Sequence, residues 1–102
     1  MSLEKKYLKS RPICKVTFRL PQKAAGDAET VNIVGDFNNW NRSADKMTRL
    51  KSGDYKISLN LTVGKTYEYR YLINGCLWEN DWYADEYRQS PVSHEENSVV
   101  IV

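Results

Sequence analysis

The chain has 102 residues, enough for a single domain that buries its own hydrophobic core. Its 41% hydrophobic and 27% charged residues are ordinary for a soluble globular protein. The formal net charge is +2, and it is unevenly distributed. Residues 1–51 contain 11 Lys and Arg and 5 Asp and Glu, whereas residues 52–102 contain 4 Lys and Arg and 8 Asp and Glu. This balance argues against a nucleic-acid partner, and we expect a flexible, solvated tail at residues 1–12 before a module at residues 13–102.

The cysteines, the histidine and the apolar pattern exclude further classes of protein. Cys14 and Cys76 are isolated and His94 is the one histidine, so the sequence indicates no zinc site and no disulfide framework, and we expect no metal or cofactor. No apolar segment approaches the length of a membrane span, and the opening MSLEKKYLKS lacks the apolar core of a signal peptide. We therefore expect a cytoplasmic protein with reduced thiols and no membrane partner.

The first half of the chain alternates apolar and polar residues in the way that half-buried strands require. We predict strands at residues 14–20, 31–34 and 55–61, and a weaker strand at residues 46–50. The segment QKAAGDAET between the first two strands is predicted to be a polar connection.

The second half of the chain predicts a hairpin and a final strand. Tyr alternates with polar residues over residues 67–73, and Asn74 with Gly75 follows, the strongest short-range signal for a hairpin turn. The return strand is expected at residues 76–78. A long aromatic and acidic loop, ENDWYADEYRQSPVSHEE, then leads to a last strand at residues 98–102.

These elements together predict an all-β fold of about seven strands. Short strands separated by turns every 8–12 residues or so favour an antiparallel β-sandwich. A small β-barrel is the alternative that the pattern leaves open. No repeat, low-complexity segment or linker divides the chain.

No catalytic motif is present, and we predict that the chain is not an enzyme. His94 lies in an acidic loop without a nucleophile motif, and GDFNNWN lacks the helix that phosphate-binding loops lead into. Several acidic residues could in principle pair as acid and base, but we expect them in a solvated loop. They are Asp81, Asp85, Glu86, Glu95 and Glu96.

Aromatic and amide residues indicate a different chemistry. Trp40 follows the strand in VNIVGDFNNWN, Trp78 follows the hairpin turn, and Arg70 lies on the strand that leads to that turn. A pyranose ring has an apolar face and a rim of hydroxyls, so it binds flat aromatic side chains flanked by hydrogen-bonding groups. Taken singly, each Trp can equally be a core residue, Arg70 a surface cation and Asn97 a turn residue. Their combination is what suggests a sugar-binding face.

Three segments, VNIVGDFNNWN, YEYRYLINGCLW and ENSVVIV, closely resemble the family 48 carbohydrate-binding modules. That family includes the glycogen-binding domain of the β subunit of AMP-activated protein kinase and the N-terminal modules of isoamylases and glycogen branching enzymes. The resemblance covers nearly the whole chain, from about Cys14 to Val102. It implies an immunoglobulin-like sandwich of the early-set type.

The resemblance also implies a set of glucan-binding residues. Trp40 and Trp78 would be stacking platforms for an α-1,4-glucan such as glycogen, Arg70 stands where the glycogen-binding domain has a lysine, and Asn97 matches a glucan-binding asparagine. Trp82 lies outside the matched positions, and we expect it to pack against the sandwich edge. The kinase-type domains insert a leucine from the loop before the last strand, whereas the corresponding segment here, SHEE at residues 93–96, has no apolar residue.

Two other functions remain open at this point. The same aromatic face, or a sheet edge, could dock onto another protein, which would make the chain an interaction or regulatory module of a glycogen-metabolising enzyme. Oligonucleotide binding is a more distant alternative that steep salt dependence would reveal.

Overall fold

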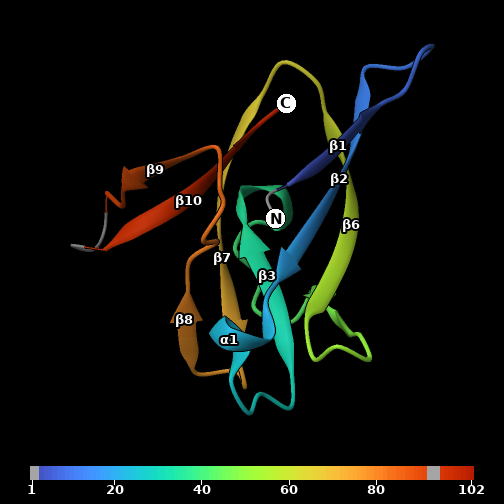
Figure 1. The fold of residues 1–102 in the computed structure, drawn as a ribbon. Coiled ribbons are helices and arrows are strands. Elements are labelled where there is room, and N and C mark those ends of the chain that lie inside the picture. The colour runs from blue at the N-terminus through green and yellow to red at the C-terminus, as the bar shows by residue number, and fades with distance from the viewer. Residues whose placement is uncertain (1–2, 92–94) are drawn as a thin grey trace.

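The computed structural model describes residues 3–91 and 95–102, and in them strands dominate (Figure 1). Its strands are β1 (Glu4–Tyr7), β2 (Ile13–Leu20), β3 (Val31–Gly35), β4 (Asp45–Lys46), β5 (Thr48–Arg49), β6 (Tyr55–Thr62), β7 (Thr66–Ile73), β8 (Leu77–Glu79), β9 (Glu86–Gln89) and β10 (Glu96–Ile101). Two short helices interrupt them, α1 (Gln22–Ala25) and the 3-10 helix η1 (Asp36–Asn38).

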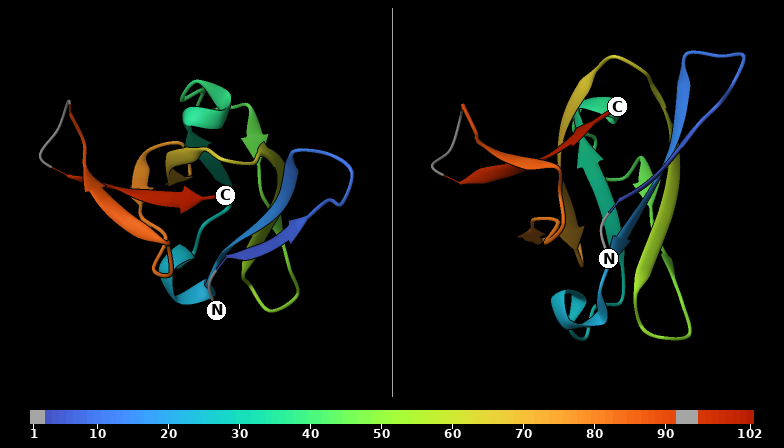
Figure 2. Two further views of the ribbon diagram at one scale, coloured as in Figure 1. Left: turned by 90° about the horizontal axis from the view of Figure 1, so that it is seen from above. Right: turned by 45° about the horizontal axis from the view of Figure 1, so that its top comes forward.

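The strands form two antiparallel sheets that face one another (Figures 1 and 2). One sheet has the order β1-β2-β6-β5, and the other has the order β4-β3-β7-β10-β9, with β8 pairing with β7. The predicted all-β, immunoglobulin-like sandwich is therefore confirmed. Figure 2 also shows β9 and the start of β10 reaching away from the body of the sandwich.

The core lies between the inner faces of β2 and β7, as the alternation predicts. Val16, Phe18 and Leu20 of β2 have no exposed surface, and neither do Tyr69 and Tyr71 of β7. The Phe18 and Tyr69 rings meet edge to face with centroids 5.0 Å apart, a favoured aromatic geometry. Because side chains alternate along a strand, this arrangement turns the residues between the tyrosines toward the outer face of the larger sheet.

The hairpin predicted from Asn74 and Gly75 is present. Both residues have positive φ, 53° and 71°, as the two central positions of a type I′ turn require. The turn closes with a 3.1 Å hydrogen bond from the Cys76 amide to the Ile73 carbonyl. The Asn74 side chain also accepts hydrogen bonds from the amides of Glu29 and Thr30, which fixes the hairpin to the loop before β3.

Residues 3–91 and 95–102 form ten strands, where about seven were predicted for the chain. Residues 4–7, which we expected in a flexible tail, form β1 against β2, and residues 86–89, expected in a loop, form β9 against β10. Both are edge strands with mainly exposed residues, so they lack the alternation that identifies half-buried strands. The weak strand predicted at residues 46–50 is two short strands on either side of the buried Met47.

Three further observations concern the described part of the chain. None of its helices is long and apolar enough to cross a membrane. Cys14 is buried, Cys76 is exposed, and both are free thiols. His94, which we predicted in an acidic loop, lies outside the described residues.

Candidate functional site

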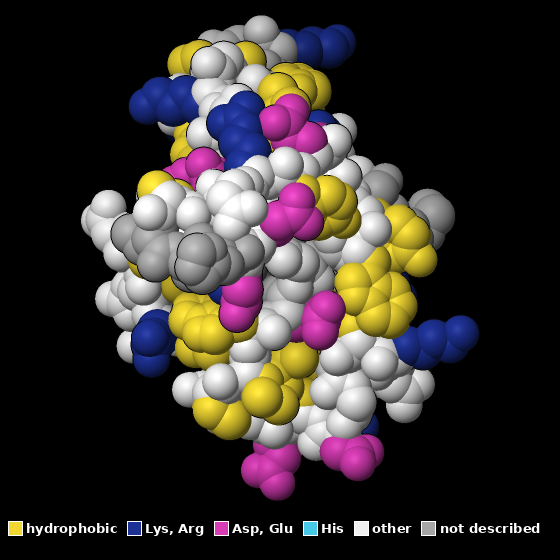
Figure 3. Space-filling view, turned by 90° about the vertical axis from the view of Figure 1, so that its left-hand side faces the viewer, with side chains coloured by type: hydrophobic (Ala, Val, Ile, Leu, Met, Phe, Trp, Pro, Cys, Tyr) yellow, Lys and Arg dark blue, Asp and Glu magenta, His cyan; other side chains and the backbone are white. Residues whose placement is uncertain are grey.

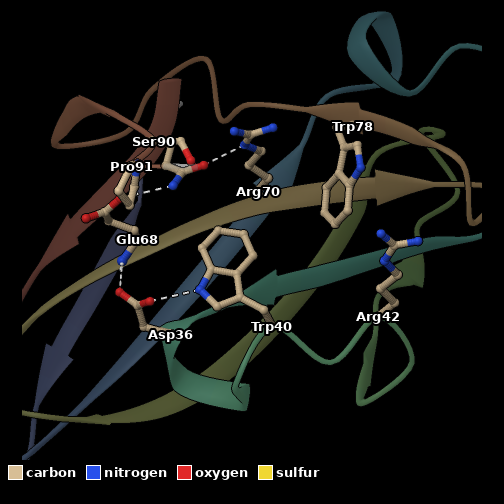
Figure 4. Close-up of a pocket in the computed structure, with 9 residues that line it drawn as sticks. Asp36, Trp40, Arg42, Glu68, Arg70, Trp78, Ser90 and Pro91 are labelled. Atoms are coloured by element: carbon tan, nitrogen blue, oxygen red, sulfur yellow. Dashed lines mark hydrogen bonds between the residues drawn. The ribbon is translucent and has the colours of Figure 1, made fainter. Parts of the chain in front are cut away.

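A cavity of about 610 Å³ lies on the outer face of the larger sheet (Figure 4). Three of its lining residues, Asp36, Trp40 and Arg42, come from the segment after β3. The others come from β7 (Glu68, Arg70), β8 (Trp78), the residues just after β9 (Ser90, Pro91) and β10 (Asn97). We call it the tryptophan cavity, because Trp40 and Trp78 enter it from opposite sides of β7.

The turn that carries Trp40 is built on a close approach of two strands. At Gly35 a Cβ atom would lie 2.5 Å from the Glu68 carbonyl oxygen of β7, so only glycine fits there. The Asn38 side chain accepts a hydrogen bond from the Gly35 amide at 3.0 Å and donates one to Asp45 at 2.8 Å. The turn is therefore fixed to β7 on one side and to β4 on the other.

The Trp40 ring is held in one orientation by Asp36. The residue has a positive φ of 57°, and its amide donates to the Gly35 carbonyl at 2.9 Å. Its indole Nε1 donates to Asp36 Oδ1 at 2.9 Å, while Asp36 Oδ2 accepts from the Glu68 amide at 2.8 Å. Trp40 is half-buried, so one part of the ring packs against the protein and the rest faces the cavity. The strained backbone and the indole hydrogen bond together present a flat apolar surface.

Trp78 supplies the second flat surface and stacks with a cation. It is paired with Leu72 of β7 and has 36% of its surface exposed. The guanidinium carbon of Arg42 lies 5.4 Å from the centroid of the Trp78 ring, within the range of a cation–π interaction. Trp78 is thus supported by β7 beneath it and by Arg42 beside it.

Arg70 and Asn97 form a hydrogen-bonded pair at the floor of the cavity. Arg70 Nε donates to Asn97 Oδ1 at 2.6 Å, and Asn97 Nδ2 donates to Glu68 Oε1 at 3.0 Å. A further Arg70 nitrogen, Nη1, bonds to Glu95 Oε2 at 3.1 Å. The Arg70 side chain is only 11% exposed, so this guanidinium is well fixed by its neighbours. Its surroundings are more polar and more crowded than those of a solvated surface cation.

All four residues predicted for the site lie in one cavity, although Trp40 and Asn97 are far apart in sequence. The sequence analysis missed other lining residues, namely Asp36, Arg42, Glu68, Ser90 and Pro91. For Asp36 and Glu68 a signal existed, since Asp36 belongs to the Gly-Asp-Phe-Asn-Asn-Trp turn and Glu68 shares its strand register with Arg70. For Arg42 and Pro91 no local pattern marks a position in a cavity.

The burial of Asp81 differs from our expectation. Asp81, predicted in a solvated loop, is 2% exposed, and its Oδ2 accepts hydrogen bonds from the hydroxyls of Tyr69 at 2.7 Å and Tyr71 at 3.1 Å. The Asp81 amide donates to Ser98 Oγ at 2.8 Å. Burial raises the pKa of Tyr69 and of Tyr71 well above 10, and the nearby Asp81 carboxylate adds to the effect for both. Asp81 therefore anchors the loop after β8 to the core.

Trp82 also differs from our expectation. Instead of packing against the sandwich edge it is 45% exposed, and its Nε1 donates to Glu79 Oε2 at 3.0 Å. It does not line the tryptophan cavity. Among the described residues, no three His, Cys, Asp or Glu side chains are grouped so that they could hold a metal ion.

Comparisons with known proteins relate this chain to a family of carbohydrate-binding modules. Residues 15–88 match the model of the family described as carbohydrate-binding module 48 (isoamylase N-terminal domain). An amylopullulanase of Thermoanaerobacter thermohydrosulfuricus is 39% identical over 59 residues, 56% of this chain and 4% of that protein. The chloroplastic/amyloplastic 1,4-alpha-glucan-branching enzyme 2-2 of Arabidopsis thaliana is 42% identical over 50 residues, 49% of this chain and 6% of that enzyme.

The matches cover much of this chain and little of the relatives. The chain spans only 4% to 6% of the length of those two enzymes, so the likeness concerns one module within each of them. The family match includes Trp40, Arg70 and Trp78, and the resemblance noted from the sequence is confirmed. The chain belongs to the carbohydrate-binding module 48 family, the isoamylase N-terminal domain family.

Proposed function

We propose that this chain is a non-catalytic module that binds α-1,4-glucans of the glycogen and starch type in the tryptophan cavity. The observation that carries the proposal is that Trp40 and Trp78 line one cavity together with Arg70 and Asn97. Two flat aromatic surfaces suit the apolar faces of glucose units, and the polar groups between them suit the hydroxyls. The named activities of the relatives, an amylopullulanase and a 1,4-alpha-glucan-branching enzyme, support the same ligand class.

The hydrogen bonds within the cavity support binding rather than catalysis. Both oxygens of Asp36 accept hydrogen bonds from fixed N–H donors, one of them the Trp40 indole. This geometry gives Asp36 the role of orienting Trp40 rather than that of transferring a proton.

A second candidate function is docking onto another protein. The side chains of Trp82, Tyr83 and Tyr87 are 45%, 43% and 40% exposed, and the edge strand β9 is exposed along its whole length. Large aromatic side chains and a free strand edge are features of protein interfaces. Figure 3, which shows the side of the molecule that holds β8 and β9, has hydrophobic groups separated by charges of both signs. This mixture does not favour an oligonucleotide partner.

Glycogen co-sedimentation with competition distinguishes the candidates. We expect the chain to sediment with glycogen, maltoheptaose to release it, and salt to have little effect because the ligand is neutral. Failure to sediment would contradict the proposal, and so would sedimentation that maltoheptaose leaves unchanged. A partner protein bound through β9 would stay bound in the presence of maltoheptaose.

A further inference from the structure

We infer that Arg42 is an additional glucan-binding residue, whose guanidinium donates hydrogen bonds to hydroxyls of the glucan where it passes the edge of the Trp78 ring. The inference rests on the proposed function, and it concerns a residue that neither the sequence pattern nor the family resemblance identified. Four features of the structure support it.

The first feature is the position of Arg42. It lines the tryptophan cavity, and its guanidinium carbon lies 5.4 Å from the centroid of the Trp78 ring. Figure 4 shows it beside Trp78, on the other side of that ring from Trp40. A glucan that stacks on Trp78 from the Trp40 side and continues past the edge of the ring would therefore bring its hydroxyls to this guanidinium.

The second feature is the hydrogen-bonding state of the two arginines in the cavity. Arg70 already bonds to Asn97 and Glu95 and is 11% exposed. Arg42 is exposed and makes no hydrogen bond or ion pair with any residue in the described ranges 3–91 and 95–102. A guanidinium carries five N–H donors in a planar fork, and all of those on Arg42 are available to a ligand.

The third feature is the fixed backbone on which Arg42 stands. The Asn41 amide donates to the Asn38 carbonyl at 3.1 Å, and the Asn41 side chain accepts from the Ser43 amide at 2.9 Å. The segment that holds Trp40 is thus tied down on both sides of Arg42. The backbone at Arg42 therefore needs little further ordering when a ligand binds, which favours affinity.

The fourth feature is the chemistry of the ligand. Neighbouring hydroxyls on a pyranose ring are acceptors set side by side, and a planar fork of donors matches two of them at once. The cation–π contact with Trp78 holds the guanidinium in place without using its N–H groups. Lys at this position would keep the charge but would lose the fork.

The test measures maltoheptaose affinity by calorimetry for the parent chain and four variants. Arg42→Ala should bind about 5- to 10-fold more weakly, and Arg42→Lys should fall between Arg42→Ala and the parent. Melting temperatures should not change, because Arg42 is exposed. The matched control is Arg49→Ala, which removes an exposed arginine of β5 in the other sheet and should bind as the parent does. Trp78→Ala is the variant that should lose binding through the proposed site itself.

The possible outcomes separate the two proposals. If Trp78→Ala loses binding while Arg42→Ala binds as tightly as the parent or more tightly, this inference is wrong and the proposed function stands. If Arg42→Lys equals the parent, the charge suffices and the assignment of the planar fork is wrong. If the parent does not bind maltoheptaose at all, both the proposed function and the inference fail.

Discussion

The indole nitrogen of Trp40 donates a 2.9 Å hydrogen bond to Asp36, and the other oxygen of the same carboxylate accepts from the backbone of β7. One side chain thereby ties the orientation of an aromatic surface to the sheet beneath it. A ring that is already oriented loses less conformational freedom when a sugar stacks on it.

Asp36→Ala should therefore weaken glucan binding by about 0.5–1.5 kcal/mol, because the Trp40 ring loses its fixed hydrogen bond. Asp36→Asn should also weaken it, because the two N–H donors reach different oxygens of the carboxylate, and in an amide one of these positions is an NH2 group that cannot accept. Maltoheptaose calorimetry measures both variants, with Asp27→Asn, an exposed residue outside the cavity, as the control. Unchanged affinity in Asp36→Ala would show that Trp40 is oriented by other contacts.

Arg70 is expected to act together with Asn97. Arg70→Ala should lose roughly 1–2 kcal/mol of glucan affinity, and Arg70→Lys should retain part of it, because Lys keeps the charge but not the fork. Asn97→Ala should have an effect that does not add to that of Arg70→Ala, since the two side chains bond to each other at 2.6 Å. A double-mutant cycle measures the coupling. Full affinity in Arg70→Ala would remove Arg70 from the binding site.

Asp81 is expected to matter for stability rather than for binding. Asp81→Ala would leave the hydroxyls of Tyr69 and Tyr71 without their acceptor in the core, which should cost roughly 2–4 kcal/mol. Urea unfolding measures the loss. The control is Glu86→Ala, which removes only an exposed pair with Arg88 and should change stability by less than about 1 kcal/mol. Equal stability of the two variants would contradict the anchoring role of Asp81.

The same tyrosines should make the fold sensitive to alkali. Burial raises the pKa of Tyr69 and Tyr71 above 10, so these side chains stay protonated in the folded state when the unfolded chain already ionises them. The folded state then binds more protons, and stability should be at its full value below about pH 10 and fall as the pH rises beyond it. Tyrosinate absorbance should show that at least two of the seven tyrosines, Tyr69 and Tyr71 among them, ionise only on unfolding. Ionisation of all seven in the folded state would contradict this prediction.

The sequence predicted the half-buried strands and the hairpin well, because their signals are local. The alternation in β2 and β6 and the Asn74–Gly75 turn each reflect the conformation of a few neighbouring residues. The edge strands β1 and β9 were missed because each pairs with one neighbouring strand only and leaves its side chains mainly exposed, so neither has an alternating pattern of its own. For these strands the tertiary structure decides the conformation.

The same distinction applies to the site. Trp40, Arg70, Trp78 and Asn97 were named in advance through the family resemblance and lie in one cavity. The contact of Arg42 with Trp78 joins residues of separate segments, which no spacing in the sequence encodes. Asp81 was expected in solvent because a lone carboxylate in a polar loop usually is, but two tyrosine hydroxyls from β7 compensate for its burial.

The most direct test of the account is a calorimetric titration of maltoheptaose into the parent chain and into Trp40→Ala, Trp78→Ala and Trp82→Ala. We expect the parent to bind with a Kd of roughly 10 µM to 1 mM, as an open cavity with two stacking surfaces should. Trp40→Ala and Trp78→Ala should lose binding with little change in melting temperature, and Trp82→Ala should bind as the parent does because Trp82 lies outside the cavity. No heat of binding in the parent, or undiminished binding in Trp40→Ala and Trp78→Ala, would contradict the claim that the tryptophan cavity binds the glucan.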